Sequence, residues 1–346
     1  MKDFVNNIFP FVSIIIPCRN EEKYIERCLD SILKNDYPKD KLEIFVVDGM
    51  STDKTVEIIK EFTQKYSFIK VLDNPKRFQV SAFNIGIKKA VGEIVIIMGS
   101  HTIYAPDYIS KCVSYLLQEN ISCVGGVCGA YAGKETYIAD AIAFALSASF
   151  GVGNAYFRIG SEKPKEVDTV PFGCYKREVF DRIGLFDEEF VVCQDDEFNY
   201  RLRKKGGKIL LVPDIKSYYY ARSTLIFLWR QYFRYGIWKV RVFQKHPHMM
   251  QVRQFIPGLF VFGLLFIISI SIFISKFLWV LGFNVLTYLI GAFFFSSKIA
   301  KKYGWKYLSF MPVVFATLHI SYGSGFLIGL VKFAHRWRTK VKCQSS

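Results

Sequence analysis

Polar and ionisable residues follow three of the apolar, β-branched runs in this chain, and their types suit the binding of a nucleotide. The first run is followed by Pro-Cys-Arg-Asn-Glu-Glu at 17–22 and the second by Asp-Gly-Met-Ser-Thr-Asp at 48–53. The fourth is followed by Gly-Ser-His at 99–101. Ligands of open α/β sheets bind beyond the carboxyl ends of the strands, so we expect these segments to meet at one edge.

Asp48 is the strongest single candidate among these residues, because it stands at a predicted strand terminus beside Gly49. Its carboxylate could accept hydrogen bonds from a base or a ribose. The neighbouring residues 51–53 are explained equally well as turn residues and caps of the next helix. No GxGxxG follows the first predicted strand and no GxxxxGK[ST] occurs in the chain, which argues against dinucleotide enzymes and P-loop NTPases.

The elements that must position these residues alternate between strand and helix over residues 1–222. This spacing predicts an α/β, Rossmann-like domain with a parallel sheet, and the continuous apolar strands predict that both faces of the sheet are covered. The expected strands cover 12–16, 42–47, 69–72 and 94–98, and the expected helices cover 22–34, 53–65, 79–90, 106–119 and 195–205.

The rest of the chain has a different composition. Hydrophobic residues make up 51% of the whole sequence and charged residues 22%, with a mean hydropathy of +0.20, which indicates a soluble domain joined to a membrane segment. Each of three apolar stretches, at 255–275, 277–297 and 307–331, exceeds the ~20 residues that cross a bilayer. We therefore expect two or three transmembrane helices within residues 254–332.

The positive charge of the chain points to a membrane surface rather than to nucleic acid. The net charge is +16, and residues 201–253 hold 13 Lys and Arg with a single acid, directly before the apolar stretches. Residues 223–253 are predicted to form a basic amphipathic interface helix. Its cations fall within an arc of roughly 60° and its apolar residues fill the adjoining arc. The cations are Arg230, Arg234, Arg241 and Lys245, and the apolar residues are Ile226, Trp229, Phe233, Ile237 and Val240.

The number of spans stays open at this point. Lysines at 298–306 place the second loop inside, together with a cytosolic N-terminal domain. A third full crossing would put the basic tail at 333–346 outside, against the positive-inside rule. The third stretch carries His319 and a Gly-Ser-Gly sequence at 323–325, so a re-entrant segment with both ends in the cytosol is the alternative.

The eight cysteines indicate a reducing compartment. They form no CxxC pair and no zinc-like Cys/His spacing, and packing explains their presence. Arg201 and the cations at 203–205 are interpreted as a solvated face or an anionic-lipid contact.

Several segments together resemble a known family. Residues 14–22 and 46–53 resemble the opening of family 2 glycosyltransferases with the GT-A fold. The closer likeness is to the succinoglycan-type, membrane-anchored glucosyltransferases of bacterial exopolysaccharide synthesis. That likeness lies in residues 170–177, 184–187, 194–198, 231–236 and 319–323. It spans nearly the whole chain, and the order and spacing of the motifs make it specific.

The resemblance implies an inverting transfer of a sugar from a nucleotide donor, expected to be UDP-linked, to a polyprenyl-linked saccharide in exopolysaccharide or cell-envelope synthesis. The enzyme would be a multi-pass protein of the inner or plasma membrane with its catalytic domain in the cytosol, in contact with membrane lipids and no nucleic acid. The implied donor-binding residues are Pro17, Arg19, Glu21 and Asp48.

The resemblance also assigns the base and the acceptor site. Such a reaction needs a group that takes the proton of the acceptor hydroxyl, and family precedent places it at Asp195, with Asp196 as the fallback. At a helix N-terminus the helix dipole would help to keep Asp195 ionised. Gln231 and Arg234 resemble the QxxRW motif, which in the family lies at the acceptor site near the membrane.

The metal site departs from the family pattern. After the fourth strand the family places Asp-x-Asp or Asp-x-His to hold a divalent cation, whereas this chain has Gly99, Ser100 and His101. His101 could hold Mg²⁺ or Mn²⁺ together with phosphate oxygens, waters and another acid. Alternatively, Arg or Lys could stabilise the leaving group, or the enzyme could be crippled.

Two rival functions follow from the same residues. One is a polyprenyl-phosphate sugar synthase, in which a bare lipid phosphate replaces the lipid-linked saccharide as acceptor. The other is a catalytically silent membrane scaffold, which Gly99 favours and which the intact Asp48, Asp195, Gln231 and Arg234 disfavour.

Overall fold

The computed structural model describes residues 9–118 and 120–337, and it divides the chain into two compact units. One unit contains Met1–Gly129 and Tyr156–Tyr220, and the other contains Ala130–Ala155 and Ala221–Ser346. Residues 130–155, which lie inside the range expected for the α/β domain, thus belong to the second unit. Residues 338–346 of the predicted basic tail lie outside the described residues.

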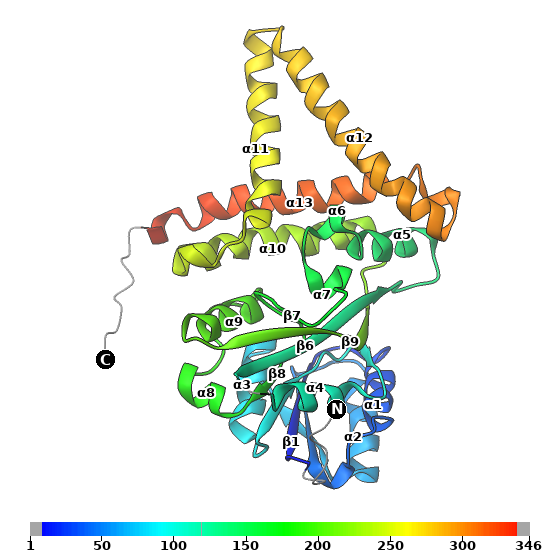
Figure 1. Ribbon diagram of the computed structural model, residues 1–346, viewed down its shortest axis with the longest axis vertical. Coiled ribbons are helices and arrows are strands. Elements are labelled where there is room, and N and C mark those ends of the chain that lie inside the picture. The colour runs from blue at the N-terminus through cyan, green and yellow to red at the C-terminus, as the bar shows by residue number, and fades with distance from the viewer. Residues whose placement is uncertain (1–8, 119, 338–346) are drawn as a thin grey trace. The chain divides into compact units, whose positions relative to one another are not determined.

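The first unit alternates strands and helices along its N-terminal half, as predicted, and all four predicted strands are present (Figure 1). The predicted helix near 195–205 is present as well. The strands are β1 (Val12–Cys18), β2 (Leu42–Asp48), β3 (Ile69–Asp73), β4 (Ile94–Ile97), β5 (Thr102–Tyr104), β6 (Ile121–Tyr131), β7 (Lys165–Glu166), β8 (Cys174–Lys176) and β9 (Lys208–Tyr220). The helices are α1 (Ile25–Leu33), α2 (Thr55–Lys65), α3 (Gln79–Lys89), α4 (Tyr108–Leu116), α7 (Tyr156–Ile159), α8 (Glu178–Ile183) and α9 (Gln194–Lys204).

The N-terminal strands form the parallel half of the sheet, in the order β3-β2-β1-β4. The register brings the carboxyl ends of β1, β2 and β3 level, because Cys18 of β1 lies opposite Asp48 of β2, which lies opposite Asp73 of β3. β4 points the same way and ends opposite Ile15 of β1. The loops that follow β1, β2 and β4 therefore leave the sheet at one edge.

The sheet is not parallel throughout, and in this respect the prediction was incomplete. Beyond β4 the order continues β8-β6-β9-β5, with β8 antiparallel to both β4 and β6, and β5 antiparallel to β9. A parallel neighbour requires a crossover of a dozen or more residues, usually helical. The strand-helix alternation that signals such crossovers stops after α4.

Both faces of the sheet are covered, as the apolar strands predicted. Successive side chains of a strand point to opposite faces, so Ile14 and Ile16 join the core beneath α1, α2 and α4, while Ile15 joins the core beneath α3, α8 and α9. Gly86 permits the close approach of α3, because a Cβ there would lie 2.5 Å from Cγ2 of Ile15.

The second unit is helical. It contains α5 (Tyr137–Leu146), α6 (Ser149–Val152), α10 (Leu225–Lys245), α11 (Val252–Phe273), α12 (Phe277–Tyr303) and α13 (Met311–Lys332). Three of these helices, α11, α12 and α13, are long and apolar enough to cross a membrane. In Figure 1, α11 and α12 form a hairpin that extends away from α10 and α13. The third apolar stretch is one continuous helix, since α13 runs through residues 323–325 without a break.

Candidate active site

The loops after β1 and β2 are joined by hydrogen bonds between side chains and backbone. The amide of Asn20 donates to Oγ of Ser51 over 2.9 Å, and the amide of Thr52 donates to Oδ1 of Asn20 over 2.8 Å. The amide of Glu21 donates to Oγ1 of Thr55 over 2.7 Å. Asn20 has a left-handed backbone with φ of 55°, which asparagine adopts more readily than most residues. These bonds hold the two loops as one rigid edge.

Asp48 lies at the end of β2, and its carboxylate is fixed by Ser51. Oδ2 accepts from the amide of Ser51 at 3.0 Å, and Oδ1 accepts from its hydroxyl at 2.5 Å. The side chain is buried, so this anchoring offsets part of the cost of placing a carboxylate there. A carboxylate has about four acceptor positions, so capacity remains for a ligand.

His101 and Glu21 approach each other across this edge. Nδ1 of His101 lies 3.3 Å from Oε1 of Glu21, and the histidine side chain is 41% exposed. Nearby, the Cys18 thiol is buried beside Glu21 and Asp48, and burial raises its pKa, as do the negative charges of these two carboxylates. The thiol therefore stays protonated at neutral pH, and Cys18 serves packing rather than nucleophilic chemistry.

Gly99 leaves no room for the missing carboxylate. A Cβ at this position would lie 2.7 Å from Cε1 and 3.1 Å from Cζ of Phe172. The backbone of Gly99 is itself held in place, because its amide donates to the hydroxyl of Tyr104 over 2.6 Å. Phe172 has φ of 52°, an unusual conformation for a bulky residue, which turns its ring over the end of β4.

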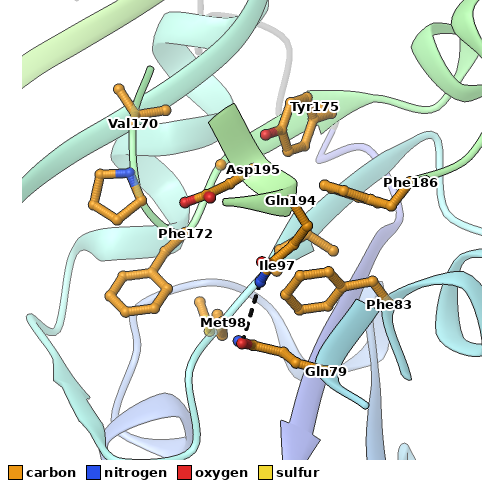
Figure 2. A pocket seen from close by; sticks show the side chains of 12 residues that line it. Gln79, Phe83, Ile97, Met98, Val170, Phe172, Tyr175, Phe186, Gln194 and Asp195 are labelled. Carbon is orange, nitrogen blue, oxygen red and sulfur yellow. Dashed lines mark hydrogen bonds between the residues drawn. The ribbon is translucent and has the colours of Figure 1, made fainter. Parts of the chain in front are cut away.

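A cavity opens at the carboxyl end of β4, and Asp195 lines it. Asp195 stands in the first turn of α9, two residues after Cys193, whose left-handed backbone (φ 64°) precedes the helix. Figure 2 shows the Asp195 carboxylate on the Phe172 side of the cavity, and Gln194 reaching Gln79 through a hydrogen bond of 3.2 Å. The remaining lining residues are Phe83, Ile97, Met98, Val170, Pro171, Gly173, Tyr175 and Phe186.

Asp196 is next to Asp195 in the same turn. Its amide donates to Oδ1 of Asp195 over 3.0 Å, so the backbone of one carboxylate residue supports the other. Asp196 is absent from the residues that line the cavity, whereas Asp195 is among them. The role of Asp195 as the base, with Asp196 as the fallback, stays a prediction.

Polar contacts of Arg201 and Asn199 hold α9 in this position. The guanidinium of Arg201 bonds to Glu197 at 2.8 Å and to the carbonyl oxygens of Ile183 and Leu185, also at 2.8 Å. Arg201 therefore ties α9 to the end of α8, and its interpretation as part of a solvated face was wrong. On the opposite side, Asn199 accepts a hydrogen bond from the hydroxyl of Tyr175 over 3.0 Å.

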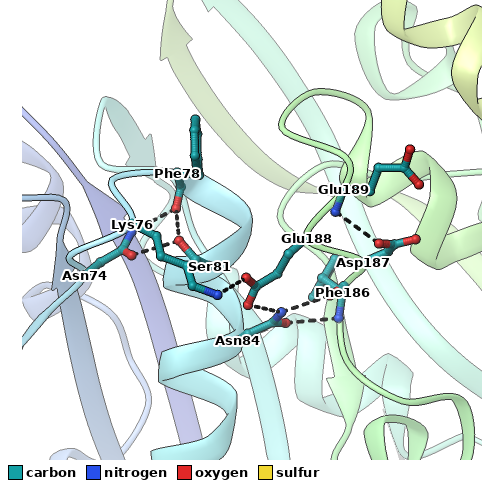
Figure 3. A network of polar contacts seen from close by, with 9 residues as sticks. All are labelled: Asn74, Lys76, Phe78, Ser81, Asn84, Phe186, Asp187, Glu188 and Glu189. Carbon is teal, nitrogen blue, oxygen red and sulfur yellow. Dashed lines mark hydrogen bonds and ion pairs between the residues drawn. The ribbon is translucent and has the colours of Figure 1, made fainter. Parts of the chain in front are cut away.

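A second polar network connects α3 to the segment that leads into α9 (Figure 3). Asn84, on α3, donates to the carbonyl of Phe186 over 2.9 Å and accepts from its amide over 3.0 Å. Lys76 reaches Glu188 at 2.6 Å, and this hydrogen-bonded ion pair lowers the pKa of the Glu188 carboxyl. The network fixes residues 186–188 and so holds the chain segment that leads into α9 and Asp195.

Gln231 and Arg234 both lie on α10, in the second unit. The side-chain amide of Gln231 donates to the hydroxyl of Tyr235, one turn later, over 2.9 Å, and Arg234 is exposed. Their part in acceptor binding stays a prediction, as do the donor-binding roles of Pro17, Arg19, Glu21 and Asp48.

Sequence reasoning missed Phe172, Tyr104 and Asn84. Phe172 belongs to the motif at 170–177, but nothing in its type signals a positive φ or a long-range contact with Gly99. Asn84 sits inside an apolar helical pattern, and a buried polar residue at such a position is a signal that could have marked it.

The arrangement of an α/β sheet, polar loops at its carboxyl edge and a carboxylate in the adjoining cavity is that of a GT-A-like domain. A family model described as glycosyl transferase family 2 matches residues 13–184. The chain is also 33% identical over 330 residues to a protein of Methanococcus voltae, with 93% of this chain and 98% of that one covered. The chain belongs to glycosyltransferase family 2.

The Methanococcus relative is named dolichyl N-acetyl-alpha-D-glucosaminyl phosphate 3-beta-D-2,3-diacetamido-2,3-dideoxy-beta-D-glucuronosyltransferase. A second relative, the succinoglycan biosynthesis protein ExoA of Rhizobium meliloti, is 31% identical over 246 residues, which cover 70% of this chain and 73% of that protein. The mannosyltransferase PcManGT of Pyrobaculum calidifontis, solved with GDP-Man and Mn²⁺, shares the fold. Its TM-score is 0.60 at 18% identity, with 94% of this chain and 88% of that one covered.

The residues of this chain do not fit the family's usual cation site. Gly99 supplies no ligand, and the ring of Phe172 occupies the space that an aspartate side chain would need. Within residues 9–118 and 120–337, no three His, Cys, Asp or Glu side chains are grouped to hold a metal ion. The pair of His101 and Glu21 provides two potential ligands only.

We expect Gly99→Ala to destabilise the protein through its contact with Phe172. Overpacking of this kind costs about 1–3 kcal/mol, because the ring or the strand must move. Phe172→Leu should relieve the contact, so the double variant should be more stable than the sum of the single changes predicts. Denaturant unfolding of the detergent-solubilised protein measures these differences.

Gly263→Ala is the matched control, because no atom lies within 4 Å of a Cβ built at that glycine. If Gly99→Ala proves as harmless as Gly263→Ala, the ring of Phe172 does not fill the space of the missing side chain.

The network beneath α9 predicts unequal costs for two neighbouring substitutions. Asn84→Ala leaves the amide and the carbonyl of Phe186 without their buried partner, at a cost of about 1–3 kcal/mol for each group. Lys76→Ala breaks an ion pair whose side chains are 64% and 38% exposed, which is worth at most about 1 kcal/mol.

The same unfolding measurement compares the two variants. The ion-pair contribution depends on an ionised Glu188, so it is present at neutral pH and is lost as the pH falls through the lowered pKa of Glu188. Equal destabilisation by Lys76→Ala and Asn84→Ala would show that the buried amide does not carry the network.

Proposed function

We propose that this chain is a membrane-anchored, inverting glycosyltransferase that moves one sugar from a UDP-linked donor to a polyprenyl-linked saccharide. The observation that carries the proposal is Asp195, which lines the cavity at the carboxyl end of β4 from the first turn of α9. The names of the relatives support the acceptor class, since one acts on a dolichyl-linked sugar and another serves succinoglycan synthesis. Assembly of an exopolysaccharide or an envelope polysaccharide is the matching role.

Asp195 is the proposed general base. In an inverting transfer the acceptor oxygen attacks the anomeric carbon from the face opposite the leaving diphosphate. The new C–O bond forms as the bond to the diphosphate breaks, and the base takes the proton of the acceptor hydroxyl. The N-terminus of α9 favours the ionised form of Asp195, because the helix dipole places partial positive charge there.

The donor is proposed to bind at the edge formed by the loops after β1, β2 and β4. Asp48 is fixed by Ser51 and offers carboxylate oxygens to a ribose or a base. Arg19 and His101 are the groups at this edge that can carry positive charge toward a diphosphate. Pro17 and Glu21 complete the proposed donor site, with Glu21 orienting His101.

The acceptor is proposed to reach the enzyme from the membrane. Gln231 and Arg234 on α10 are its proposed contacts, and the exposed guanidinium of Arg234 suits a lipid-linked phosphate. The α/β domain would then work on the cytosolic face of the cell membrane, where nucleotide sugars are available.

A silent scaffold is the second candidate function, and one observation favours it. The contact of Gly99 with Phe172 removes a ligand of the family's cation site without an evident replacement. A scaffold would keep nucleotide binding and show no transfer, so binding and turnover must be measured separately.

We expect Asp195→Asn to abolish sugar transfer and leave donor binding intact. General-base catalysis contributes about 10²–10⁴-fold to a rate, and the amide cannot accept the proton. Asp196→Asn is the matched control, because it changes the same charge in the same turn outside the cavity, and it should retain most of the activity. Lipid-linked transfer by the detergent-solubilised full chain, across a panel of nucleotide sugars, provides the readout.

Further arms of this assay separate the alternatives. Loss of transfer in Asp196→Asn with retention in Asp195→Asn would contradict the assignment of the base. Transfer to a bare polyprenyl phosphate in preference to a lipid-linked saccharide would identify a polyprenyl-phosphate sugar synthase. Parallel reactions with Mn²⁺, Mg²⁺ or EDTA test whether transfer needs a divalent cation. Transfer that persists in EDTA would show that cationic side chains stabilise the leaving diphosphate. Nucleotide binding without transfer to any acceptor would support the scaffold.

A further inference from the structure

Two helices of the second unit, α10 and α13, run side by side in the same direction. The backbone of Gly325 packs against the carbonyl of Phe233, and Gly329, one turn later on α13, packs against Ile237, one turn later on α10. At the far end the side-chain amide of Gln244 donates to the carbonyl of Phe333 over 2.8 Å. The contacts advance together along both chains, so the helices stay paired over several turns.

Glycines make this pairing close. A Cβ at Gly329 would lie 2.8 Å from the carbonyl oxygen of Ile237 and 2.9 Å from Cγ2 of Val240. Gly236 of α10 meets the backbone of α13 at Tyr322 in the same way. Close backbone packing of this kind fixes the direction of α13 to that of α10.

The contact covers the C-terminal part of the apolar stripe of α10. Ile237 and Val240 belong to one apolar cluster with Tyr322 and Phe326 of α13, and Gly325 meets the backbone of Phe233. In this part α13 occupies the place where an amphipathic surface helix would meet lipid, whereas Ile226 at the start of α10 stays exposed.

The charge of α10 shows how this pair must lie. α10 carries five cations and no acid in 21 residues, and it begins five positions after the last residue of β9. A helix with that charge does not cross the hydrocarbon core, because each charge would lose its hydration there. A helix that is packed along α10 in the same direction does not cross it either.

Burial within the protein, rather than a membrane crossing, explains why α13 is apolar. Of its most apolar 18-residue window, 44% is buried, against 11% for α11 and 6% for α12. The hairpin of α11 and α12 instead exposes large apolar side chains near its tip, including Phe266, Phe273, Trp279 and Phe283. The hairpin thus offers the largely apolar, exposed surface that lipid requires.

We infer that α13 is not a membrane span. α10 and α13 form one layer parallel to the membrane surface, and the α11–α12 hairpin alone enters the bilayer. The end of α13 then lies on the same side as the α/β domain. The lysines at 298–306, with Lys332 and Arg336, fall on this side too, where anionic headgroups attract them.

Cross-linking tests the pairing of the helices. Gln244→Cys with Phe333→Cys places two thiols at facing positions of α10 and the end of α13, because the Gln244 side chain reaches the Phe333 carbonyl, and a short bismaleimide should link them in the full chain in membranes. Gln244→Cys with Val313→Cys is the matched control, because Val313 lies at the other end of α13 and should not react. Failure of the first pair, or equal cross-linking of both, would overturn the inference.

Sidedness tests the layer itself, without reference to enzymatic activity. In a Cys343→Ser background, single cysteines replace the exposed residues Glu61 on α2, His335 after α13, and Ser275 at the hairpin tip. The seven cysteines of the described residues are buried, so they contribute little background. An impermeant maleimide is then applied to sealed membrane vesicles of each orientation.

We expect His335→Cys to be labelled to the same extent as Glu61→Cys and from the same side. Three crossings would instead place His335→Cys with Ser275→Cys on the side opposite Glu61→Cys, and that result would overturn the inference. A protease-sensitive tag fused to the C-terminus provides a second readout if the His335 variant fails to accumulate. Its cleavage only from the side opposite the α/β domain would lead to the same rejection.

Discussion

The parallel pairing of β1 with β2 and β4 is the constraint on which the site depends. The carboxyl ends of β1 and β2 lie level and β4 ends opposite Ile15 of β1, so three loops that are far apart in sequence leave the sheet at its carboxyl edge. Burial of the strands on both faces fixes this register, because a slip by one residue would turn every side chain to the opposite face. The hydrogen bonds from the amides of Asn20 and Glu21 to Ser51 and Thr55 then fix the loop after β1 relative to the loop after β2.

The elements that the hydrophobic pattern of the sequence encodes could be predicted. The contacts between residues far apart in the sequence could not. Apolar runs placed the four N-terminal strands and the apolar helices within a few residues. The strand-end rule placed Asp48 and His101 at one edge, where the structure has them. No local sequence pattern encodes the contact of Phe172 with Gly99, because the two residues are far apart in the chain and Phe172 has a left-handed backbone. The same holds for the hydrogen bonds of Arg201 to the end of α8, which join separate elements. Hydropathy likewise found α13 and gave no information about its pairing with α10.

The two sides of the proposed reaction are built by different means. The proposed donor site rests on the backbone of a parallel sheet and on the loops after β1 and β2. Hydrogen bonds between these loops hold them rigidly. Asp195 depends on a helix whose position is set by side-chain contacts, above all those of the half-buried Arg201 and the buried Asn199. Buried polar contacts of this kind are costly when one partner is missing, so residues well away from the cavity control where the carboxylate lies.

The contact between Gly99 and Phe172 also restricts which substitutions these two positions tolerate. A side chain at position 99 collides with the ring, and a smaller residue at 172 leaves a void over the strand end, so neither change is favourable by itself. An acidic side chain at position 99 would therefore require a change at position 172 as well. Because either substitution alone is expected to lower stability, the two positions are constrained to change as a pair.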